Sequence, residues 1–247
     1  MVKIYTHIGR YVMLMGQVFS RPERLSLYRR LIIQEIDKIG LQSLGIVALL
    51  SLFMGAVVTL QTAANIDSGW IPKFTIGFTS RQTMILEFSS TIVCLILSGK
   101  VGSNIASEIG TMRISEQIDA MDIMGVNSAS YLILPKIIAA VFIFPFLVII
   151  SMFLGIAAGA MAGTAAGVIS LSDYEYGLQY YFDLWHVFSS LIKTLVFAFI
   201  ITSVSSYHGY YTRGGALEVG KSSTQAVVYS IILVMISNYM LTQILLL

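Results

Sequence analysis

Two ionisable side chains lie inside long apolar stretches of the sequence, where a charge is costly. Glu87 and Lys193 are each flanked by apolar residues, and a charge at the middle of a bilayer costs roughly 2.5–3.5 kcal/mol on insertion scales. We expect the two to pair and to face a protein interior or a wet cavity. A purely structural ion pair and a pair that lines a wet cavity both fit this pattern.

Motifs for catalysis and metal binding are absent from the sequence. It has no Gly-x-x-x-x-Gly-Lys-Ser/Thr loop for nucleotide phosphates, no His-Glu-x-x-His motif and no Cys/His cluster with metal-ligand spacing. The single cysteine, Cys94, excludes an internal disulfide. We therefore expect no enzyme activity, metal or cofactor on this chain, and the energy for any uphill transport has to come from a partner.

The composition is that of an integral membrane protein. Hydrophobic residues make up 56% of the chain and charged residues 11%, whereas soluble domains carry roughly 25% charged residues, and the mean hydropathy is +0.81. The 247 residues leave room for about five or six spanning helices of roughly 20 residues each. The net charge of +2 is small and spread along the chain, so it does not indicate nucleic-acid binding.

The apolar stretches predict an all-α protein with five transmembrane helices. We place the spans at about residues 41–64, 82–98, 132–165, 184–207 and 224–247. Residues 1–40 carry too many charges to span and predict an amphipathic helix at the membrane surface, although a solvated basic tail would have the same charges. Its basic residues are Lys3, Arg10, Arg21, Arg24, Arg29, Arg30 and Lys38.

The distribution of positive charge predicts the orientation. The segment Ser172–Asp183 contains no Lys or Arg, in contrast to the basic N-terminal segment. The positive-inside rule then places the N-terminus in the cytoplasm and the C-terminus in the periplasm, with Asp67–Arg81 and Ser172–Asp183 as outer loops. An odd number of spans without a visible duplication argues against the common plans of secondary transporters.

A row of glycines follows the kink site that Pro145 offers in the third apolar stretch. They recur at every fourth position and would form a smooth ridge for close helix packing. Packing within the subunit and a surface facing lipid or a second copy are both open. The glycines are Gly155, Gly159, Gly163 and Gly167.

Between the second and third spans lies a polar stretch, about residues 103–127. Ser115 is a candidate N-cap, Glu116 places negative charge in the first helical turn and Gly125 is suited to end the helix. Such a helix has an apolar face and an acidic ridge, and therefore requires a partner surface. The apolar face is Ile114, Ile118 and Met121, and the ridge is Glu116, Asp119 and Asp122.

This polar stretch resembles the signature of a known family. The run from Glu108 to Met121, with Met124-Gly-Val-Asn127 and Tyr131-Leu-x-x-Pro135 after it, is similar to the MlaE (YrbE) family of ABC-transporter permeases. Phe53-x-Gly55, Ser98–Gly102, Leu191-Ile-Lys193 and Val219–Thr224 are similar to other parts of the family pattern. The resemblance covers roughly residues 44–247.

The resemblance implies a homodimeric permease of the bacterial inner membrane that moves phospholipids between the inner and outer membranes and so maintains outer-membrane lipid asymmetry. It implies a cytoplasmic ATPase pair, which carries ATP and Mg, and a periplasmic MCE-domain lipid-binding protein. It also implies that the signature couples the permease to the ATPase, through Glu108, Gly110, Arg113, Glu116, Gln117, Asp119, Met121 and Gly125. The implied lipid pathway includes Glu87, Lys193, Gln61 and Phe53.

The chain departs from the family pattern near the implied lipid pathway. Leu86 replaces a common arginine, Phe88-Ser-Ser90 replaces Leu-Gly-Pro, and Asn238 replaces an aspartate of the last helix. Two other classes of function stay open on the sequence alone. One is an ion-coupled secondary transporter that uses Glu87 and Lys193 as a relay, and the other is a passive membrane scaffold for a partner complex.

Overall fold

The computed structural model describes residues 2–20, 25–66 and 71–246. The regular elements in these ranges are all helical, and five helical segments are long and apolar enough to cross a membrane. The predicted all-α membrane fold is therefore confirmed. Arg21, Arg24 and residues 67–70 of the first predicted outer loop lie outside the described residues.

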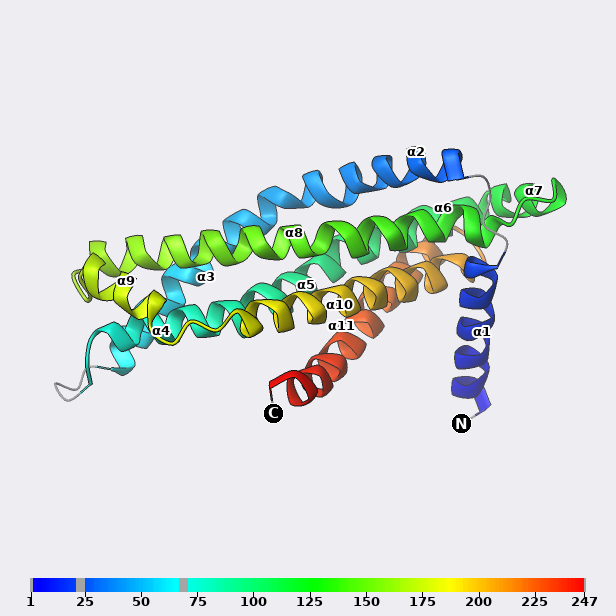
Figure 1. Ribbon diagram of the computed structural model, residues 1–247. Helices are drawn as coiled ribbons and strands as arrows, with labels where there is room; N and C mark the ends of the chain where they lie inside the picture. The colour runs from blue at the N-terminus through cyan, green and yellow to red at the C-terminus, as the bar shows by residue number, and fades with distance from the viewer. Residues whose placement is uncertain (1, 21–24, 67–70, 247) are drawn as a thin grey trace. The chain divides into compact units, whose positions relative to one another are not determined.

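The α-helices follow one another along the chain (Figure 1), and three short π-helical segments, here named η1 to η3, lie between them. In order they are α1 (Val2–Phe19), α2 (Leu25–Ile36), η1 (Asp37–Leu41), α3 (Gln42–Asn65), α4 (Phe74–Thr83), η2 (Met84–Ile92), α5 (Val93–Leu97), η3 (Ser98–Gly102), α6 (Ser103–Ile114), α7 (Gln117–Ile123), α8 (Ser128–Ala165), α9 (Leu171–Gln179), α10 (Leu184–Tyr210) and α11 (Ala216–Leu246).

The helices that contain the first two predicted spans extend well beyond them. They are Tyr28–Asn65, of 38 residues, and Phe74–Ile114, of 41 residues; at 1.5 Å per residue the second is roughly 60 Å long. Helix continues through residues 25–40, which we had placed in a separate surface segment, and through residues 103–114. The sequence prediction ended the spans where charges appear, but these charges have partners in the protein and do not interrupt the helix.

The third segment, α8, has 38 residues and continues without interruption through Pro145. It ends where Gly167 adopts a positive φ of 70°. The amide of Gly167 donates to the Thr164 carbonyl over 3.0 Å and that of Val168 to the Gly163 carbonyl over 3.2 Å, which is the Schellman pattern for ending a helix. Gly167 therefore terminates α8 and does not belong to the predicted packing ridge.

The chain forms two compact units, which are described separately. The first contains Met1–Gln42, Leu95–Ile143 and Val196–Ser237, and the second contains Ser43–Cys94, Phe144–Leu195 and Asn238–Leu247.

Glycines bring two helices of the second unit into close contact. A methyl group added to Gly55 of α3 would overlap the Gly155 carbonyl of α8. One added to Gly159 would meet the side chains of Thr59 and Tyr174, and one added to Gly163 would meet Ile169 at 2.9 Å. Three of the four predicted ridge glycines thus pack inside the subunit, where only a hydrogen atom fits.

The same unit contains the small helices α4 and α9, which lie side by side (Figure 1). Added methyl groups at Gly77 and Gly177 would collide with the backbone of the opposite helix. The predicted outer loop Ser172–Asp183 is therefore largely helical, and its helix is capped by Ser170, whose hydroxyl accepts from the Asp173 amide over 3.1 Å.

In the first unit, α6 and α1 both pack against α10. A methyl group at Gly209 of α10 would lie 2.8 Å from the Ala106 carbonyl of α6. From α1, Tyr11 donates to the Ser203 hydroxyl over 2.9 Å, and His7 Nδ1 lies 2.7 Å from the Tyr207 hydroxyl. The exposed apolar side chains of α1 are Tyr5, Ile8, Val12, Met13 and Phe19; its place at the membrane surface stays a prediction.

Candidate functional site

Glu87 and Lys193 form an ion pair. The Lys193 ammonium, on α10, lies 3.2 Å from Glu87 Oε1 and donates over 3.4 Å to the Leu86 carbonyl. The Lys193 side chain is completely buried, whereas that of Glu87 is 43% exposed. Glu87 lies in η2, and π-helical segments inside α-helices are frequent at functional sites. The predicted ion pair is therefore present, and Glu87 is the member of the pair that solvent or a ligand can reach.

Two further side chains complete this site, and we call Glu87, Thr91, Lys193 and Asn238 the Glu87 cluster. Thr91 Oγ1 and Asn238 Nδ2 each donate to Glu87 Oε2 over 3.1 Å. Asn238 Oδ1 is buried and has no hydrogen-bond partner among the described residues. One carboxylate is thus balanced by one ammonium, and an aspartate at position 238 would add a second carboxylate against Glu87.

Of the four residues predicted for the lipid pathway, the structure brings Glu87 and Lys193 together. Phe53 and Gln61 lie on exposed positions of α3, with Phe53 65% exposed, and Gln61 contributes none of the polar contacts to Glu87 or Lys193 found in the described residues. Thr91 and Asn238 were not predicted as site residues. The sequence does point to Asn238, because its amide side chain lies inside the last apolar stretch, where a polar group requires a partner.

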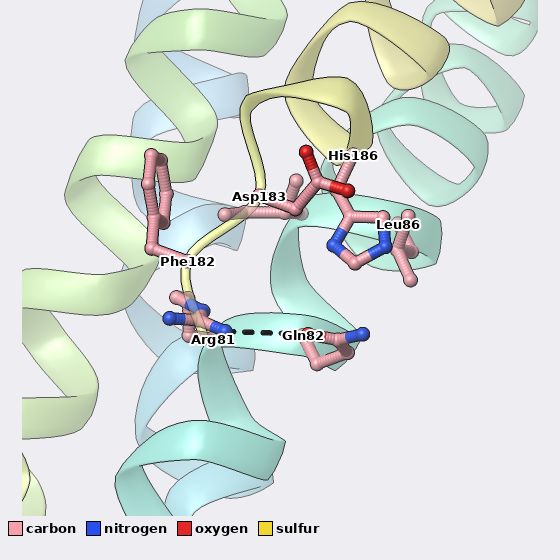
Figure 2. A pocket seen from close by; sticks show the side chains of 7 residues that line it. Arg81, Gln82, Leu86, Phe182, Asp183 and His186 are labelled. Carbon is pink, nitrogen blue, oxygen red and sulfur yellow. Dashed lines mark hydrogen bonds between the residues drawn. The ribbon is translucent and has the colours of Figure 1, made fainter. Parts of the chain in front are cut away.

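A pocket lies next to Leu86 (Figure 2), the residue whose carbonyl accepts from Lys193. It is lined by Arg81, Gln82, Ile85, Leu86, Phe182, Asp183 and His186. We expected Arg81 in an outer loop, but it belongs to α4 and is 3% exposed. Its guanidinium donates to the backbone carbonyls of Leu178, Tyr180 and Tyr181.

These bonds make Arg81 a structural residue. The three carbonyls lie at the C-terminal end of α9, where helix carbonyls lack intrahelical donors and attract positive charge. The guanidinium carbon also lies 5.1 Å from the ring centroid of Phe78 and 5.5 Å from that of Phe182. No carboxylate ion pair of Arg81 occurs in the described part of the chain. Arg81 therefore fastens α4 to the end of α9.

The polar signature forms a helical hairpin, α6 followed by α7, in the first unit. Ser115 does not cap α7 as predicted, since it is the C-cap of α6 and its hydroxyl bonds back to the Thr111 carbonyl over 2.8 Å. The turn is made by Glu116, whose φ of 59° is rare outside glycine. Gly125 ends α7 as predicted, with a φ of 80° and a bond from the Val126 amide to the Met121 carbonyl.

The outer surface of the α6–α7 hairpin combines acidic and apolar side chains. Glu116, Gln117, Asp119 and Asp122 are exposed, while Ile118 is buried and Met121 half-buried. At the end of α7, Ile123 is 87% exposed and Met124 is 71% exposed. These last two residues were not among the predicted coupling residues, although their position just before the helix-ending Gly125 was visible in the sequence.

Two predicted coupling residues stabilise the hairpin from within. Arg113 forms an ion pair with Asp119 over 2.7 Å, and its guanidinium carbon lies 5.8 Å from the Tyr210 ring centroid. An added methyl group at Gly110 would lie 3.3 Å from Val219 and 3.4 Å from Thr212. Both residues fix α6 against its neighbours and lie behind the surface that a partner would touch.

The Asn127 side chain fastens the end of the signature to α1. Its Nδ2 donates to the carbonyls of Gln17 and Ser20, over 3.0 and 2.9 Å, and its Oδ1 accepts from the Ser130 amide over 3.2 Å at the start of α8. One side chain thus caps two helices, which orients α1 with respect to the hairpin.

Comparison with known proteins identifies the family. The model of the family Permease MlaE matches residues 32–244. The chain belongs to the MlaE permease family. A probable ABC transporter permease protein of Rickettsia bellii is 36% identical over 98% of this chain and 93% of its own length. A probable ABC transporter permease protein of Synechocystis is 34% identical over 93% of this chain and 87% of its own length. The chloroplastic protein TRIGALACTOSYLDIACYLGLYCEROL 1 of Arabidopsis thaliana is 32% identical over 92% and 65%.

As an MlaE permease, the chain is a multi-pass membrane protein and a transport subunit of an ABC transporter. An ABC transporter permease implies an ATPase partner. This agrees with the sequence, which contains no phosphate-binding loop of its own. The family assignment also favours the permease over the secondary transporter and the passive scaffold.

Proposed function

We propose that this permease moves phospholipids between the inner and outer membranes of a bacterium and so maintains outer-membrane lipid asymmetry. It would act as a homodimer with a cytoplasmic ATPase pair, which holds ATP and Mg, and with a periplasmic MCE-domain protein. The observation that carries the proposal is the Glu87 cluster, in which a fully buried lysine on a membrane-spanning helix is paired with a carboxylate that is 43% exposed.

The geometry of the Glu87 cluster suits a phosphate headgroup. Lys193 has three N–H donors, two of which meet Glu87 and the Leu86 carbonyl. Because the Lys193 ammonium is fully buried and Glu87 is the accessible partner, a phosphate headgroup would have to displace the Glu87 carboxylate in order to reach the ammonium. Glu87 would hold Lys193 in position between transport cycles. A lipid cargo also agrees with the glycerolipid in the name of the Arabidopsis relative.

The exposed surface of the α6–α7 hairpin is proposed to bind the ATPase. Ile123 and Met124 would enter an apolar groove, and the carboxylates around them would face basic side chains. Charges at the rim of an interface select the partner and the register, while buried apolar anchors supply most of the affinity.

A charge reversal on the hairpin tests this interface. We expect Glu116→Lys with Asp122→Lys to reduce co-purification of the ATPase by about tenfold or more, because like charges facing each other cost several kcal/mol. Asp119 is left unchanged because it pairs with Arg113 within the hairpin. The exposed Glu175 of α9 provides a control, Glu175→Lys, which should leave co-purification unchanged. Normal ATPase binding by the double variant would contradict the docking role.

A second copy of the chain is proposed to cover α11. This helix exposes apolar side chains along much of its length, namely Val228, Tyr229, Ile232, Leu233, Met235, Ile236, Tyr239, Met240 and Ile244. A large apolar surface of this kind requires lipid or another protein. The glycine ridge does not serve this purpose, because Gly155, Gly159 and Gly163 pack inside the subunit.

The proposed orientation has the N-terminus and the hairpin in the cytoplasm of the cell and the C-terminus in the periplasm. Cysteines placed at the exposed positions Ser115 and Ser172 test it, with the buried Cys94 as the background. In intact cells an impermeant maleimide should label Ser172→Cys and leave Ser115→Cys unlabelled. Labelling of Ser115→Cys from outside would contradict the orientation.

The composition of the complex is measured by native mass spectrometry after purification in a mild detergent. We expect two permease copies, two ATPase copies and co-purified phospholipid, and we expect Lys193→Met to lose the lipid while it keeps the protein subunits. A complex that contains the ATPase but no phospholipid in either form would contradict the proposed cargo.

A further inference from the structure

A second group of charges lies in the first unit around the buried Lys136, and neither the family name nor the proposed cargo accounts for it. We call Glu35, Lys38, Glu108 and Lys136 the four-charge cluster. Lys136 Nζ lies 2.9 Å from Glu35 Oε1 and 2.5 Å from Glu108 Oε2. Lys38 Nζ lies 3.2 Å from Glu108 Oε1 and 3.8 Å from Glu35 Oε1. The four residues come from α2, η1, α6 and α8, and their charges sum to zero.

Lys136 is the central member of the cluster. Its side chain is 5% exposed, and it is shared between a carboxylate of the first long helix and one of the second. Glu35 is 13% exposed, whereas Glu108 and Lys38 are 42% and 52% exposed. Because a buried charge must stay paired, the Lys136 ammonium restricts how far α2, α6 and α8 can separate.

The cluster permits two pairings of equal charge. In one, Lys136 binds Glu35 while Lys38 binds Glu108. In the other, Lys136 binds Glu108 while Lys38 binds Glu35. All four contacts are already within 3.8 Å. A helix can therefore move from one pairing to the other without leaving any buried charge unpaired, which is a requirement for a two-state element inside a protein.

Glu108 connects this element to the α6–α7 hairpin. It lies in the middle of α6, and α6 leads directly into the turn at Glu116. A displacement of the hairpin is transmitted along the rigid helix to Glu108. Arg113 and Gly110 pack α6 against the end of α10 and the start of α11, so these segments would move together with α6.

We propose that Lys136 is a positioning residue that couples the hairpin to the first and third long helices by exchanging carboxylate partners. ATP-driven movement of α6 would change the pairing, and the change in pairing would move α2 and α8. The inference rests on the proposed function, since it assigns to Lys136 the transmission of ATP-driven movement to the transport path. It does not depend on the identity of the lipid.

The test compares four variants in the purified complex with its ATPase, reconstituted with fluorescent phosphatidylethanolamine. Lys136→Met removes the ammonium, and Lys136→Arg keeps the charge and can bind two carboxylates. The double variant Lys136→Met with Glu35→Gln also removes the Glu35 carboxylate, which loses its buried ammonium partner in Lys136→Met. The control is Lys221→Met, which breaks the exposed Lys221–Glu218 pair of 2.6 Å in the same unit.

We expect Lys136→Met to reduce lipid transfer per ATP hydrolysed by about tenfold, within the usual range of coupling between sites. Lys136→Arg and Lys221→Met should behave like the wild type. The double variant should recover the wild-type melting temperature but keep the low transfer per ATP. If the double variant recovered both the melting temperature and the transfer per ATP, Lys136 would have only a structural role and the inference would be overturned. Normal transfer per ATP in Lys136→Met would overturn it as well.

A second measurement separates this inference from the proposed cargo. Spin labels at Ser115 and Ile138, both exposed, report the distance between the end of α6 and α8 with and without ATP, in a protein with Cys94→Ala. The distance should change in the wild type and stay constant in Lys136→Met. A wild-type complex that hydrolyses ATP without moving lipid would contradict the cargo only. The same change of distance in both proteins would contradict the role of Lys136.

Discussion

The Glu87 cluster and the four-charge cluster both place a buried lysine on a membrane-spanning helix, yet they differ in what surrounds it. Lys193 has one carboxylate partner, and the remaining contacts of that carboxylate come from the neutral side chains Thr91 and Asn238. Lys136 has two carboxylate partners, and a second lysine reaches both of them.

We propose that this difference suits the two lysine–carboxylate arrangements to two different purposes. In the Glu87 cluster, no second cation balances the carboxylate, so that a charged headgroup could change the balance with little rearrangement of protein. In the four-charge cluster every charge has an alternative partner, so that helices can move without a ligand. The first arrangement suits binding and the second suits movement.

The largest effect is expected from a change that disturbs the helix contact in the unit of the Glu87 cluster without altering a charge. Gly55→Ala places a methyl group on the Gly155 carbonyl, and α3 and α8 must separate. Met84 of η2 packs on the same Gly155, so the segment that carries Glu87 would shift as well. We expect no folded, monodisperse protein in size-exclusion chromatography.

The control is Gly45→Ala on the same helix, where an added methyl group meets nothing within 4 Å. It should change stability by less than about 1 kcal/mol, since alanine is also the better helix former. Normal folding of Gly55→Ala would show that the close packing of α3 on α8 is not needed.

The next largest effect is the loss of transport on removal of the buried lysine. Lys193→Met should fold, because Glu87 is partly exposed and keeps its bonds from Thr91 and Asn238. Lipid transfer should fall by about tenfold or more, because a hydrogen bond to a charged group contributes roughly 1.5–3 kcal/mol. Transfer and assembly are measured for Lys193→Met and Glu87→Gln in parallel. Normal transfer in both variants would eliminate the headgroup role, and failed assembly in both would make the pair structural.

A smaller effect is expected at Asn238. Asn238→Asp replaces the amide that donates to Glu87 over 3.1 Å by a second carboxylate, and the loss of one hydrogen bond with added repulsion should cost about 1–2 kcal/mol. Transfer should fall a few-fold, and Glu87→Gln in the same chain should restore it by returning the cluster to one negative charge. Asn104→Asp, at an exposed position, is the control. A melting temperature and transfer rate equal to the wild type would show that the charge balance of the cluster is irrelevant.

The sequence predicted the fold class, the five spans and the contact between Glu87 and Lys193, because apolar length and the cost of an isolated charge in a membrane are both local properties. The helix end at Gly125 was predicted for the same reason. What failed depended on partners far away in the chain. Lys136 was not singled out, since Glu35 and Glu108 were assigned to a surface segment and to a coupling element.

The helices extend beyond the predicted spans for a related reason. Lys38, Lys100 and Glu108 do not interrupt the helices because each has a partner, and Lys100 donates to the Gln42 carbonyl. Gly167 shared the spacing of the glycine ridge and yet ends the helix, since the sequence did not show where α8 stops. The exposure of Ile123 and Met124 could not be predicted from the sequence, because it depends on how α7 packs.

The most direct test of the account is ATP-dependent lipid transfer by the complete complex. Donor liposomes contain the permease with its ATPase and fluorescent phosphatidylethanolamine, the acceptor is the purified periplasmic partner protein, and wild type and Lys193→Met are measured with ATP and with a non-hydrolysable analogue. The account predicts transfer that requires hydrolysis in the wild type and is lost in Lys193→Met although ATP is still hydrolysed. Hydrolysis by the wild type without any lipid transfer in either direction would contradict it.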